Sequence, residues 1–386
     1  MSAPSPHTFH VLAGMFFFNS VAWRGGKLLI ALGALTLGAD AFLVGVLAAV
    51  YAILPMLLAV QAGRMSDRLG AKRPIILGAV ALALAALLPA IHLTFITLLL
   101  CPILLGLGQL FIQVAVHNGV GSIGESEVRS TNYARLQVYG SLAAFLGPLA
   151  TGLAIDHLGL QWGFAVVGTG AVLVFVTAMT LGGHLRPAVL ADGREKHGRT
   201  FDLLTHPGLR RTLFASAVAM CGLELSAFYI PIYGDSIGLS ATMIGAVLAT
   251  QASAAFIVRA FMRGLLKHAR EMTVLIVALF LGAASFALIP VFNNVPVLFA
   301  SAILLGLSLG VATPLTQAMA YTHSPKGRTG EALGLRISVN KAMQVTVPLA
   351  FGTLGATMGV APVFWANAAV LTLGGLVCAA DRRHRG

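Results

Sequence analysis

Long apolar stretches follow one another along almost the whole chain, and short polar stretches separate them. A helix needs about 20 mainly apolar residues to cross a bilayer. Backbone facing lipid must be hydrogen-bonded internally, and no stretch alternates as a strand would. We therefore predict an all-α membrane protein with twelve transmembrane helices, near residues 9–37, 42–62, 74–91, 95–118, 132–155, 161–182, 209–233, 240–261, 273–290, 296–320, 331–356 and 361–380.

Composition agrees with this pattern. Hydrophobic residues make up 58% of the 386 residues, charged residues only 10%, and the mean hydropathy is +0.88. Soluble domains are about a quarter charged, so a soluble protein is excluded. The N-terminus has no basic region before the first apolar stretch, which we expect to stay as a helix and not to be a cleaved signal. The three cysteines lie in apolar stretches and indicate no disulfide framework.

Basic residues gather in alternate loops. If the N-terminus is cytoplasmic, the cytoplasmic segments hold 19 of the 25 basic residues and the outer loops hold none. This asymmetry predicts that both termini are cytoplasmic, and it explains the net charge of +12 without a nucleic-acid partner. The other six basic residues lie inside predicted spans: Arg24, Lys27, Arg135, Arg259, Arg336 and Lys341.

A polar segment and an internal repeat divide the chain in two. We predict a six-helix bundle over 1–182, a cytoplasmic linker over 183–208 and a second six-helix bundle over 209–386. The sequence ILLGL occurs at 103–107 and again at 303–307. At the same spacing, Pro148 and Gly152 recur as Pro348 and Gly352. Two parallel six-helix halves are a transporter architecture.

The loop between the second and third predicted helices reads GRMSDRLGAKR, residues 63–73. Gly63 would let the helix end pack closely, and Gly70 would allow a turn with positive φ. Asp67 is an isolated acid among bases, and it can pair with an arginine or sit at the positive end of another helix. The bases would also be attracted to the cytoplasmic leaflet. The simpler interpretation is a loop that only anchors the helices.

Together with the twelve predicted helices and the repeat, this loop resembles the signature loop of the major facilitator superfamily. Gly63, Asp67, Arg68, Gly70, Lys72 and Arg73 fill the places of that pattern. The resemblance implies two pseudo-symmetric six-helix bundles, a monomer, and a loop that acts as a conformational gate. We assign Arg129, from the loop after the fourth helix, to the same gate. The counterpart at 259–270 keeps its bases but lacks the acid.

A second stretch, GSLAAFLGPLATG at 140–152, resembles a motif of the family's antiporters. Gly140, Gly147, Pro148 and Gly152 match it, but Thr151 replaces a glycine. The resemblance favours export by antiport, while ordinary close packing of helices is the alternative. The arginine that the family's drug exporters carry in the fourth helix is missing here, and Gln109 and Gln113 stand in that helix instead.

Four charges are predicted to lie deep in the spans. Arg24 is roughly 21 Å from the cytoplasmic end of its helix, with Lys27 one turn further, and Lys341 is roughly 15 Å in. Glu224 is the acid placed near the middle of a span. Buried charges seldom face lipid. In one interpretation the bases attract an anionic substrate; in the other, one or more of them pair with Glu224. One acid cannot pair with all three bases.

Glu224 is the predicted proton carrier, because burial and nearby cations shift a carboxyl pKa in opposite directions. A fixed salt bridge is the alternative. Arg135, Arg259 and Arg336 are interpreted as interface anchors or interhelical braces. His117 follows Gln109 and Gln113 on one helix face, either as a titrating group or as a hydrogen-bonded brace. Further candidate substrate contacts are Asn19, Trp23, Tyr229, Gln317, Asn340 and Gln344.

These observations predict a secondary transporter in an inner or plasma membrane, driven by a proton gradient and without a bound cofactor or metal. Antiport of a small organic anion or amphipathic compound is the favoured function. Uptake of a carboxylate by symport is the close alternative, and a receptor or sensor that transports nothing is a third. An enzyme is not expected, since the chain shows neither a metal-site spacing nor a nucleotide-binding glycine loop.

Overall fold

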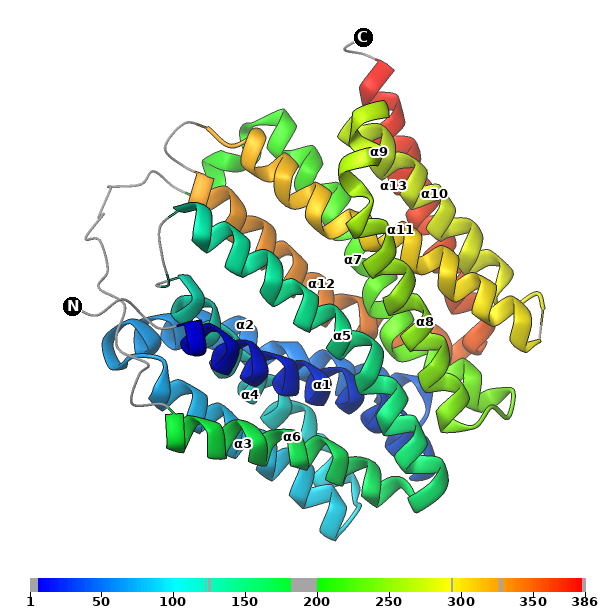
Figure 1. Ribbon diagram of the computed structural model, residues 1–386. Helices are drawn as coiled ribbons and strands as arrows, with labels where there is room; N and C mark the ends of the chain where they lie inside the picture. Colours follow the sequence, from blue (N-terminus) through cyan, green and yellow to red (C-terminus); the bar gives the residue numbers. More distant parts are fainter. Residues whose placement is uncertain are drawn as a thin grey trace. The chain divides into compact units, whose positions relative to one another are not determined.

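The computed structural model describes residues 6–121, 123, 126–181, 200–292, 294–325 and 329–383 (Figure 1). These residues form thirteen α helices and one short 3₁₀ helix, and they contain no strand. The prediction of an all-α protein is therefore confirmed for the described part of the chain.

Each predicted span coincides with a long helix, and most ends agree within a few residues. The helices are α1 (Pro6–Thr36), α2 (Ala41–Leu69), α3 (Lys72–Ile91), α4 (Phe95–Gly121), α5 (Ser126–Leu158), α6 (Leu160–Leu181), η2 (Thr200–Thr205), α7 (Pro207–Ser236), α8 (Ala241–Ala260), α9 (Met262–His268), α10 (Glu271–Leu288), α11 (Val295–Thr322), α12 (Thr329–Met358) and α13 (Val360–Arg383). The sequence did not predict η2 or α9, because both lie in polar segments too short to span a membrane.

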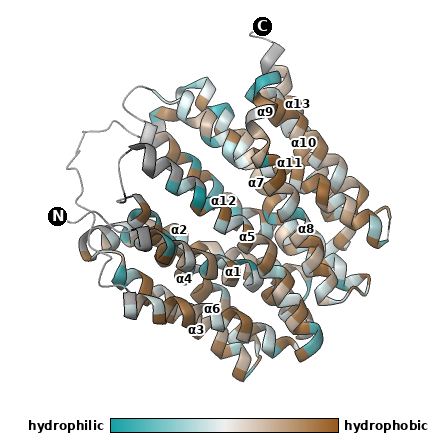
Figure 2. Ribbon diagram, in the orientation of Figure 1, coloured by the Kyte–Doolittle hydropathy of each residue, from teal (hydrophilic) through white to brown (hydrophobic). Residues whose placement is uncertain are grey.

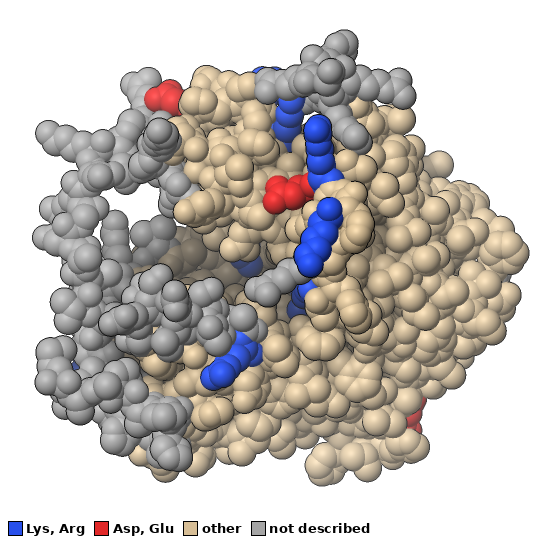
Figure 3. Space-filling view, turned by 45° about the horizontal axis from the view of Figure 1, so that its top comes forward, with Lys and Arg blue, Asp and Glu red and all other residues tan. Residues whose placement is uncertain are grey.

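Within the described residues, ten helices are long and apolar enough to cross a membrane. The two long helices outside that set are α1, which carries Arg24 and Lys27, and α12, which carries Arg336 and Lys341. Figure 2 shows apolar positions along most helices and hydrophilic positions within α12. In Figure 3, broad areas of the surface carry no charged side chain, as a surface in contact with lipid requires. The chain is a multi-pass membrane protein, and the count of twelve spans stays a prediction.

Contacts divide the chain into two compact units. One holds Met1–Asp192 together with Gly234–Ala249, and the other holds Gly193–Tyr233 together with Thr250–Gly386. In the first unit α1 packs against α4, α5 and α6, while α3 packs against α4 and α6. The helix α8 begins in the first unit and ends in the second. The predicted domain boundaries at residues 182 and 209 stay a prediction.

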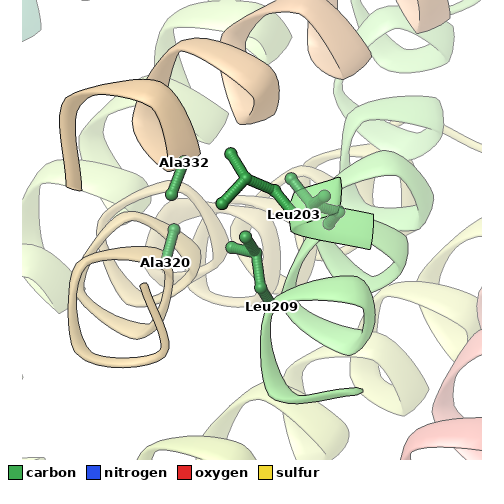
Figure 4. Close-up of a cluster of buried hydrophobic side chains, with 5 residues drawn as sticks. Leu203, Leu209, Ala320 and Ala332 are labelled. Carbon is green, nitrogen blue, oxygen red and sulfur yellow. The ribbon is translucent and has the colours of Figure 1, made fainter. Parts of the chain in front are cut away.

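In the second unit, α10 packs against α11 and α13, and α12 packs against α11 and α13. The 3₁₀ helix η2 inserts the fully buried Leu203 into a cluster with Leu209 of α7, Ala320 of α11 and Ala332 of α12 (Figure 4). Burial of one leucine side chain contributes about 1.5–3 kcal/mol. The segment that precedes α7 is therefore attached to its own unit by apolar contacts.

Turn glycines support the internal duplication independently of the sequence matches. Gly38 and Gly238 both have φ of 77°, and Gly159 and Gly359 have φ of 96° and 86°. Each pair is separated by the same two hundred residues as the ILLGL repeat. Positive φ favours glycine, so the same turns recur at the same places in both halves of the sequence.

A helix crossing also recurs at this spacing. An added Cβ at Gly106 of α4 would meet the backbone oxygen of Tyr51 in α2. An added Cβ at Gly306 of α11 would meet the backbone oxygen of Gln251 in α8. Both glycines therefore permit backbone-to-backbone contact between the second and fourth helices of a repeat.

Helix α5 packs closely against the beginning of α8 in the first unit. An added Cβ at Gly152 would meet the backbone of Ala241, and one at Gly245 would meet the backbone of Pro148. One turn beyond, the Asp156 carboxylate accepts hydrogen bonds from the amides of Ala241 (2.9 Å) and Thr242 (2.7 Å). A carboxylate at the N-terminal amides stabilises the helix dipole, so Asp156 caps α8 from a neighbouring helix.

We expect Gly245→Val to lower the melting temperature of the purified protein by about 5 °C, because overpacking costs about 1–3 kcal/mol. The new Cβ would lie against the Pro148 carbonyl and 3.3 Å from the Leu149 Cα, and backbone atoms cannot rotate away. The control is Gly14→Ala in α1, where nothing lies within 4 Å of the new Cβ and alanine improves helix propensity. Equal melting temperatures for the two variants would contradict the close crossing.

Candidate functional site

Arg24 stands out by its exposure in the middle of helix α1, whose residues 11–35 are otherwise buried or half-buried. All of residues 11–35 are described, and among them Arg24 alone is exposed. Charged side chains in membrane helices avoid lipid, so we expect polar surroundings at Arg24. The structure thus singles out one of the bases that the sequence placed deep in the first span.

The glycine motif of α5 lies against this turn of α1. An added Cβ at Gly147 would lie 2.9 Å from the Val21 carbonyl oxygen and 3.2 Å from the Arg24 Cβ. Gly140 lies similarly close to the Phe16 ring. Thr151, which departs from the family's motif, is fully buried against Gly25. The motif therefore brings α5 onto α1 at Arg24 and, through Pro148 and Gly152, onto α8.

Trp23 and Lys27 form a compact group with Tyr51 of α2. The Lys27 Nζ lies over the Trp23 ring, 5.5 Å from its centroid, within the range of a cation–π interaction. The Tyr51 ring packs edge-to-face on the Trp23 ring at 4.3 Å, and the Tyr51 hydroxyl donates to the Trp23 carbonyl at 3.1 Å. Lys27 and Tyr51 thus both contact the Trp23 ring, Lys27 from the same helix and Tyr51 from α2.

Polar side chains continue along α4 as predicted. The Gln109 Nε2 donates to the Gln113 Oε1 at 3.2 Å, so the two lie on one face. The His117 Nδ1 lies 2.7 Å from the Gln113 carbonyl oxygen, which can only accept, so Nδ1 carries a proton. The His117 ring stacks on Tyr133 and meets Phe16 edge-on. These contacts suit a hydrogen-bonded brace, and the choice between a brace and a titrating group stays a prediction.

Glu224 lies in α7 and is only 6% exposed. It occupies the position of the repeat that Arg24 occupies in α1. Two residues later, the Ser226 hydroxyl donates to the Leu223 carbonyl and accepts from the Gln251 Nε2 of α8 at 3.0 Å. Tyr229, one turn further, is buried, and its hydroxyl has no hydrogen-bond partner among the described residues.

Helix α12 contributes the other predicted polar residues of the second unit. The Lys341 Nζ donates to the Gln344 Oε1 at 3.0 Å, which joins two of the candidates. The Asn340 Oδ1 accepts from the Ser216 hydroxyl of α7 at 2.8 Å. These bonds put Asn340 on the side of α12 that meets α7.

Two arginines act as interhelical braces, as predicted. The Arg259 Nε donates to the Gly310 carbonyl at 2.8 Å, joining α8 to α11. Arg336 is 6% exposed and donates to the Thr316 hydroxyl at 3.4 Å, joining α12 to α11. Arg135 is exposed on α5. Burial of the charged Arg336 side chain costs free energy, and the bond to Thr316 offsets only part of this cost. The Arg336 Nε has no hydrogen-bond partner among the described residues.

Two further candidates differ in their surroundings. Asn19 of α1 is fully buried, and neither side-chain atom has a hydrogen-bond partner among the described residues. Gln317 of α11 is exposed. The structure thus joins Trp23 with Lys27 in the first unit and Lys341 with Gln344 in the second.

The predicted gate loop is described only in part. Gly70 ends α2 with φ of 73°, so its positive-φ prediction is confirmed. Among the described residues nothing lies within 4 Å of an added Cβ at Gly63, and its close packing stays a prediction. Lys72 and Arg73 begin α3, half-buried and exposed respectively. The side chains of Asp67, Arg68 and Arg129 lie outside the described part of the chain.

The sequence matches the family model of the Major Facilitator Superfamily over residues 12–292 and again over 212–385. The chain belongs to the Major Facilitator Superfamily. It is a transporter of this family and not an enzyme. No curated protein matches the chain in sequence.

Solved structures of the superfamily share the fold. A POT family transporter in complex with 5-aminolevulinic acid is 14% identical, with a TM-score of 0.78, over 97% of this chain and 96% of that one. A peptide transporter POT in complex with sulfate is 15% identical, with a TM-score of 0.81, over 98% and 95%. A variant of the nucleoside transporter NupG is 12% identical, with a TM-score of 0.80, over 97% and 99%. At these identities the likeness concerns the fold.

Sequence reasoning missed two residues that support the charged turns of this superfamily member, Tyr51 and Gln251. Both side chains are uncharged and lie in mainly apolar stretches, so their residue type alone does not mark them. The signal that would have found them is the repeat: they lie two hundred residues apart, opposite the paired glycines Gly106 and Gly306.

Proposed function

We propose that this transporter exports a small organic anion or an amphipathic compound in exchange for protons. The observation that carries the proposal is the exposed Arg24 among buried and half-buried residues of α1, with the Lys27 ammonium one turn away. A guanidinium binds a carboxylate or phosphate through two parallel hydrogen bonds, and an ammonium adds a point charge. The pair suits an anionic head group attached to an apolar body.

The second unit supplies a group for proton coupling. Glu224 is buried in α7, at the position of the repeat that Arg24 holds in α1. A carboxylate in such a place gains or loses a proton as its surroundings change between conformations. Lys341, bonded to Gln344, adds a base in α12. Pairing of Glu224 with one of the bases is the alternative.

Two of the structural relatives support an anionic or zwitterionic solute, since they were solved with sulfate and with 5-aminolevulinic acid. The antiport direction rests on the α5 motif, whose Gly147 and Gly152 lie against α1 and α8. Uptake of a carboxylate by symport uses the same charges and is the second candidate. A sensor that binds an anion without moving it is the third.

A neutral solute is favoured by a different observation. The amides of Gln109 and Gln113 form a polar face on α4 that offers donors and acceptors without charge. A relative with this fold is a nucleoside transporter. Binding of a nucleoside in place of an anion would assign the site to these amides.

The proposal includes the topology. We propose twelve spans in two six-helix bundles, both termini in the cytoplasm, the bacterial-type inner membrane as the location, and a monomer that alternates access to the two sides of the membrane. Twelve spans require α1 and α12 to cross the membrane although α1 carries Arg24 and Lys27 and α12 carries Arg336 and Lys341.

The first test is the thermal stability of the purified protein with benzoate, phenyl phosphate, uridine and tetraphenylphosphonium. We expect the two anions to raise the melting temperature. Stabilisation by uridine alone would favour the neutral solute, and stabilisation by the cation alone would contradict the anion site. Proteoliposomes loaded with the stabilising anion then decide direction, because antiport moves protons against the anion and symport moves them with it.

A further inference from the structure

In both repeats the second helix hydrogen-bonds to the charged turn of the first. The Tyr51 hydroxyl of α2 donates to the Trp23 carbonyl, in the turn that carries Arg24 and Lys27. The Gln251 amide of α8 donates to the Ser226 hydroxyl, in the turn that carries Glu224. Tyr51 and Gln251 are equivalent positions of the duplication, as are Gly26 and Ser226.

The surroundings of Tyr51 fix its place. Tyr51 is 2% exposed, and Gly106 of α4 lies directly against its backbone. An added Cβ at Gly26 would lie 3.0 Å from the Tyr51 hydroxyl, so glycine leaves the room that this hydroxyl needs. Tyr51 therefore lies between α4 and the turn of α1 that carries Arg24 and Lys27, here called the cation turn.

Tyr51 reaches the cations through Trp23. Its ring holds the indole edge-to-face, and the Lys27 ammonium lies over that indole. A lysine side chain has four rotatable bonds, and a cation–π contact limits them. The orientation of the indole thus sets where the Lys27 charge lies relative to Arg24 on the same turn.

Gln251 makes the corresponding contact in the second unit. The Ser226 hydroxyl accepts from Gln251 and donates to the Leu223 carbonyl, so the amide is tied to the backbone that flanks Glu224. Gly306 of α11 lies against the Gln251 backbone, as Gly106 lies against that of Tyr51. The repeat has kept the position and the contact while the side chain differs.

We propose that Tyr51 and Gln251 are positioning residues. Tyr51 positions the cation turn, which binds the anion. Gln251 positions the turn of α7 that carries Glu224, here called the acid turn, which couples protons. The proposal rests on the proposed function for the roles of the two turns. Tyr51 sets the separation of the two positive charges and thereby the preference between a planar and a tetrahedral anion. Gln251 leaves anion affinity unchanged and affects the driven rate.

The test of Tyr51 begins without any ligand, in a Trp162→Phe/Trp365→Phe background where Trp23 is the remaining tryptophan. We expect Tyr51→Leu to lower the fluorescence anisotropy of Trp23. We expect Lys27→Met to shift the Trp23 emission when Tyr51 is present and to leave it unchanged in Tyr51→Leu. A shift of equal size in both backgrounds would overturn the positioning role, whatever the protein transports.

Binding of benzoate and phenyl phosphate gives the second readout. We expect Tyr51→Phe to weaken the preferred anion about 2- to 10-fold, as loss of one hydrogen bond does, and Tyr51→Leu to bring the two affinities closer together. Lys27→Met should then weaken binding about fivefold in the wild type and less than twofold in Tyr51→Leu, because neighbouring residues are non-additive.

The matched control is Tyr233 of α7, which makes the same two kinds of contact as Tyr51. Tyr233 is buried, donates to the Ile289 carbonyl at 2.9 Å, and packs edge-to-face on Phe364. Tyr233→Leu should lower stability as Tyr51→Leu does but keep the wild-type ratio of the two affinities. An equal change in that ratio would show that Tyr51 has only a structural role.

Gln251→Leu is tested by benzoate flux in proteoliposomes. We expect a lower maximal rate under a pH gradient with an unchanged KM, whereas Tyr51→Leu should raise the KM. Ser226→Ala should reproduce the Gln251→Leu result, because it removes the same hydrogen bond. A raised KM in Gln251→Leu would overturn its assignment. If no anion binds the wild type, the proposed function fails, while the ligand-free Trp23 result still decides the role of Tyr51.

Discussion

Arg24→Ala is expected to weaken benzoate and phenyl phosphate binding by about a hundredfold or more and to stop their flux in proteoliposomes. Arg24 is exposed in the middle of α1, with Gly147 of α5 packed against its Cβ. A bound anion would shield its guanidinium from water, and removal of one partner from such a charge pair typically costs about 2–5 kcal/mol. Titration calorimetry measures the affinity, and flux under an imposed pH gradient measures transport.

Two variants serve as controls for Arg24. Arg24→Lys keeps the charge but loses the two-point contact, so we expect an intermediate loss. Arg135→Ala removes an exposed arginine from α5 and should leave anion binding unchanged. If Arg24→Ala binds anions like the wild type, Arg24 is a structural partner of Glu224, and export of cationic or neutral compounds becomes the better proposal.

Glu224→Gln is expected to abolish accumulation driven by a pH gradient, with at least a tenfold loss, while exchange of anion for anion persists. Glutamine resembles the protonated acid in shape, but it cannot release a proton. Glu224 is buried in α7, and no other carboxylate lies on the same helix turn to take over its proton. The two fluxes are measured in the same proteoliposomes, with and without the gradient.

Glu271→Gln is the matched control, because Glu271 is an acid in the first turn of α10 and outside the predicted site. It should keep both fluxes. Gradient-driven accumulation by Glu224→Gln would place the proton carrier elsewhere. Loss of both fluxes together with a lower melting temperature, restored by adding Arg24→Ala, would show that the acid and the base form a fixed pair.

The helices were predictable because each needs about 20 apolar residues, and such stretches are visible one by one. Boundaries failed where this requirement does not apply. α2 continues past its predicted end at residue 62 to Leu69, because a helix can extend beyond the apolar stretch into polar residues. η2 and α9 are short and amphipathic, and η2 is held by the contact of Leu203 with three other helices. Such contacts depend on how distant helices pack together, and the sequence of one segment does not show this.

The candidate site was predictable where charge alone marks a residue. Arg24, Lys27, Glu224 and Lys341 were identified because charges are rare in membrane helices. Tyr51 and Gln251 were not identified, because their function is a hydrogen bond to another helix, and this depends on how two helices cross. A glycine in the sequence permits a close contact, but only the neighbouring helix decides whether one is made, as it is at Gly106 and Gly306.

The polar content of α1 has a consequence for how the protein is made. α1 precedes the helices it packs against, and it carries Arg24, Lys27 and the fully buried Asn19. A single arginine or lysine at the centre of a helix costs about 2.5–3.5 kcal/mol in insertion by the translocon. Its packing partners α4, α5 and α6 are synthesised later. We therefore expect α1 to insert stably in the bilayer only after α6 is complete. In nascent chains that stop before α4, α1 should be cleaved by added protease or should bind membrane-bound insertion factors.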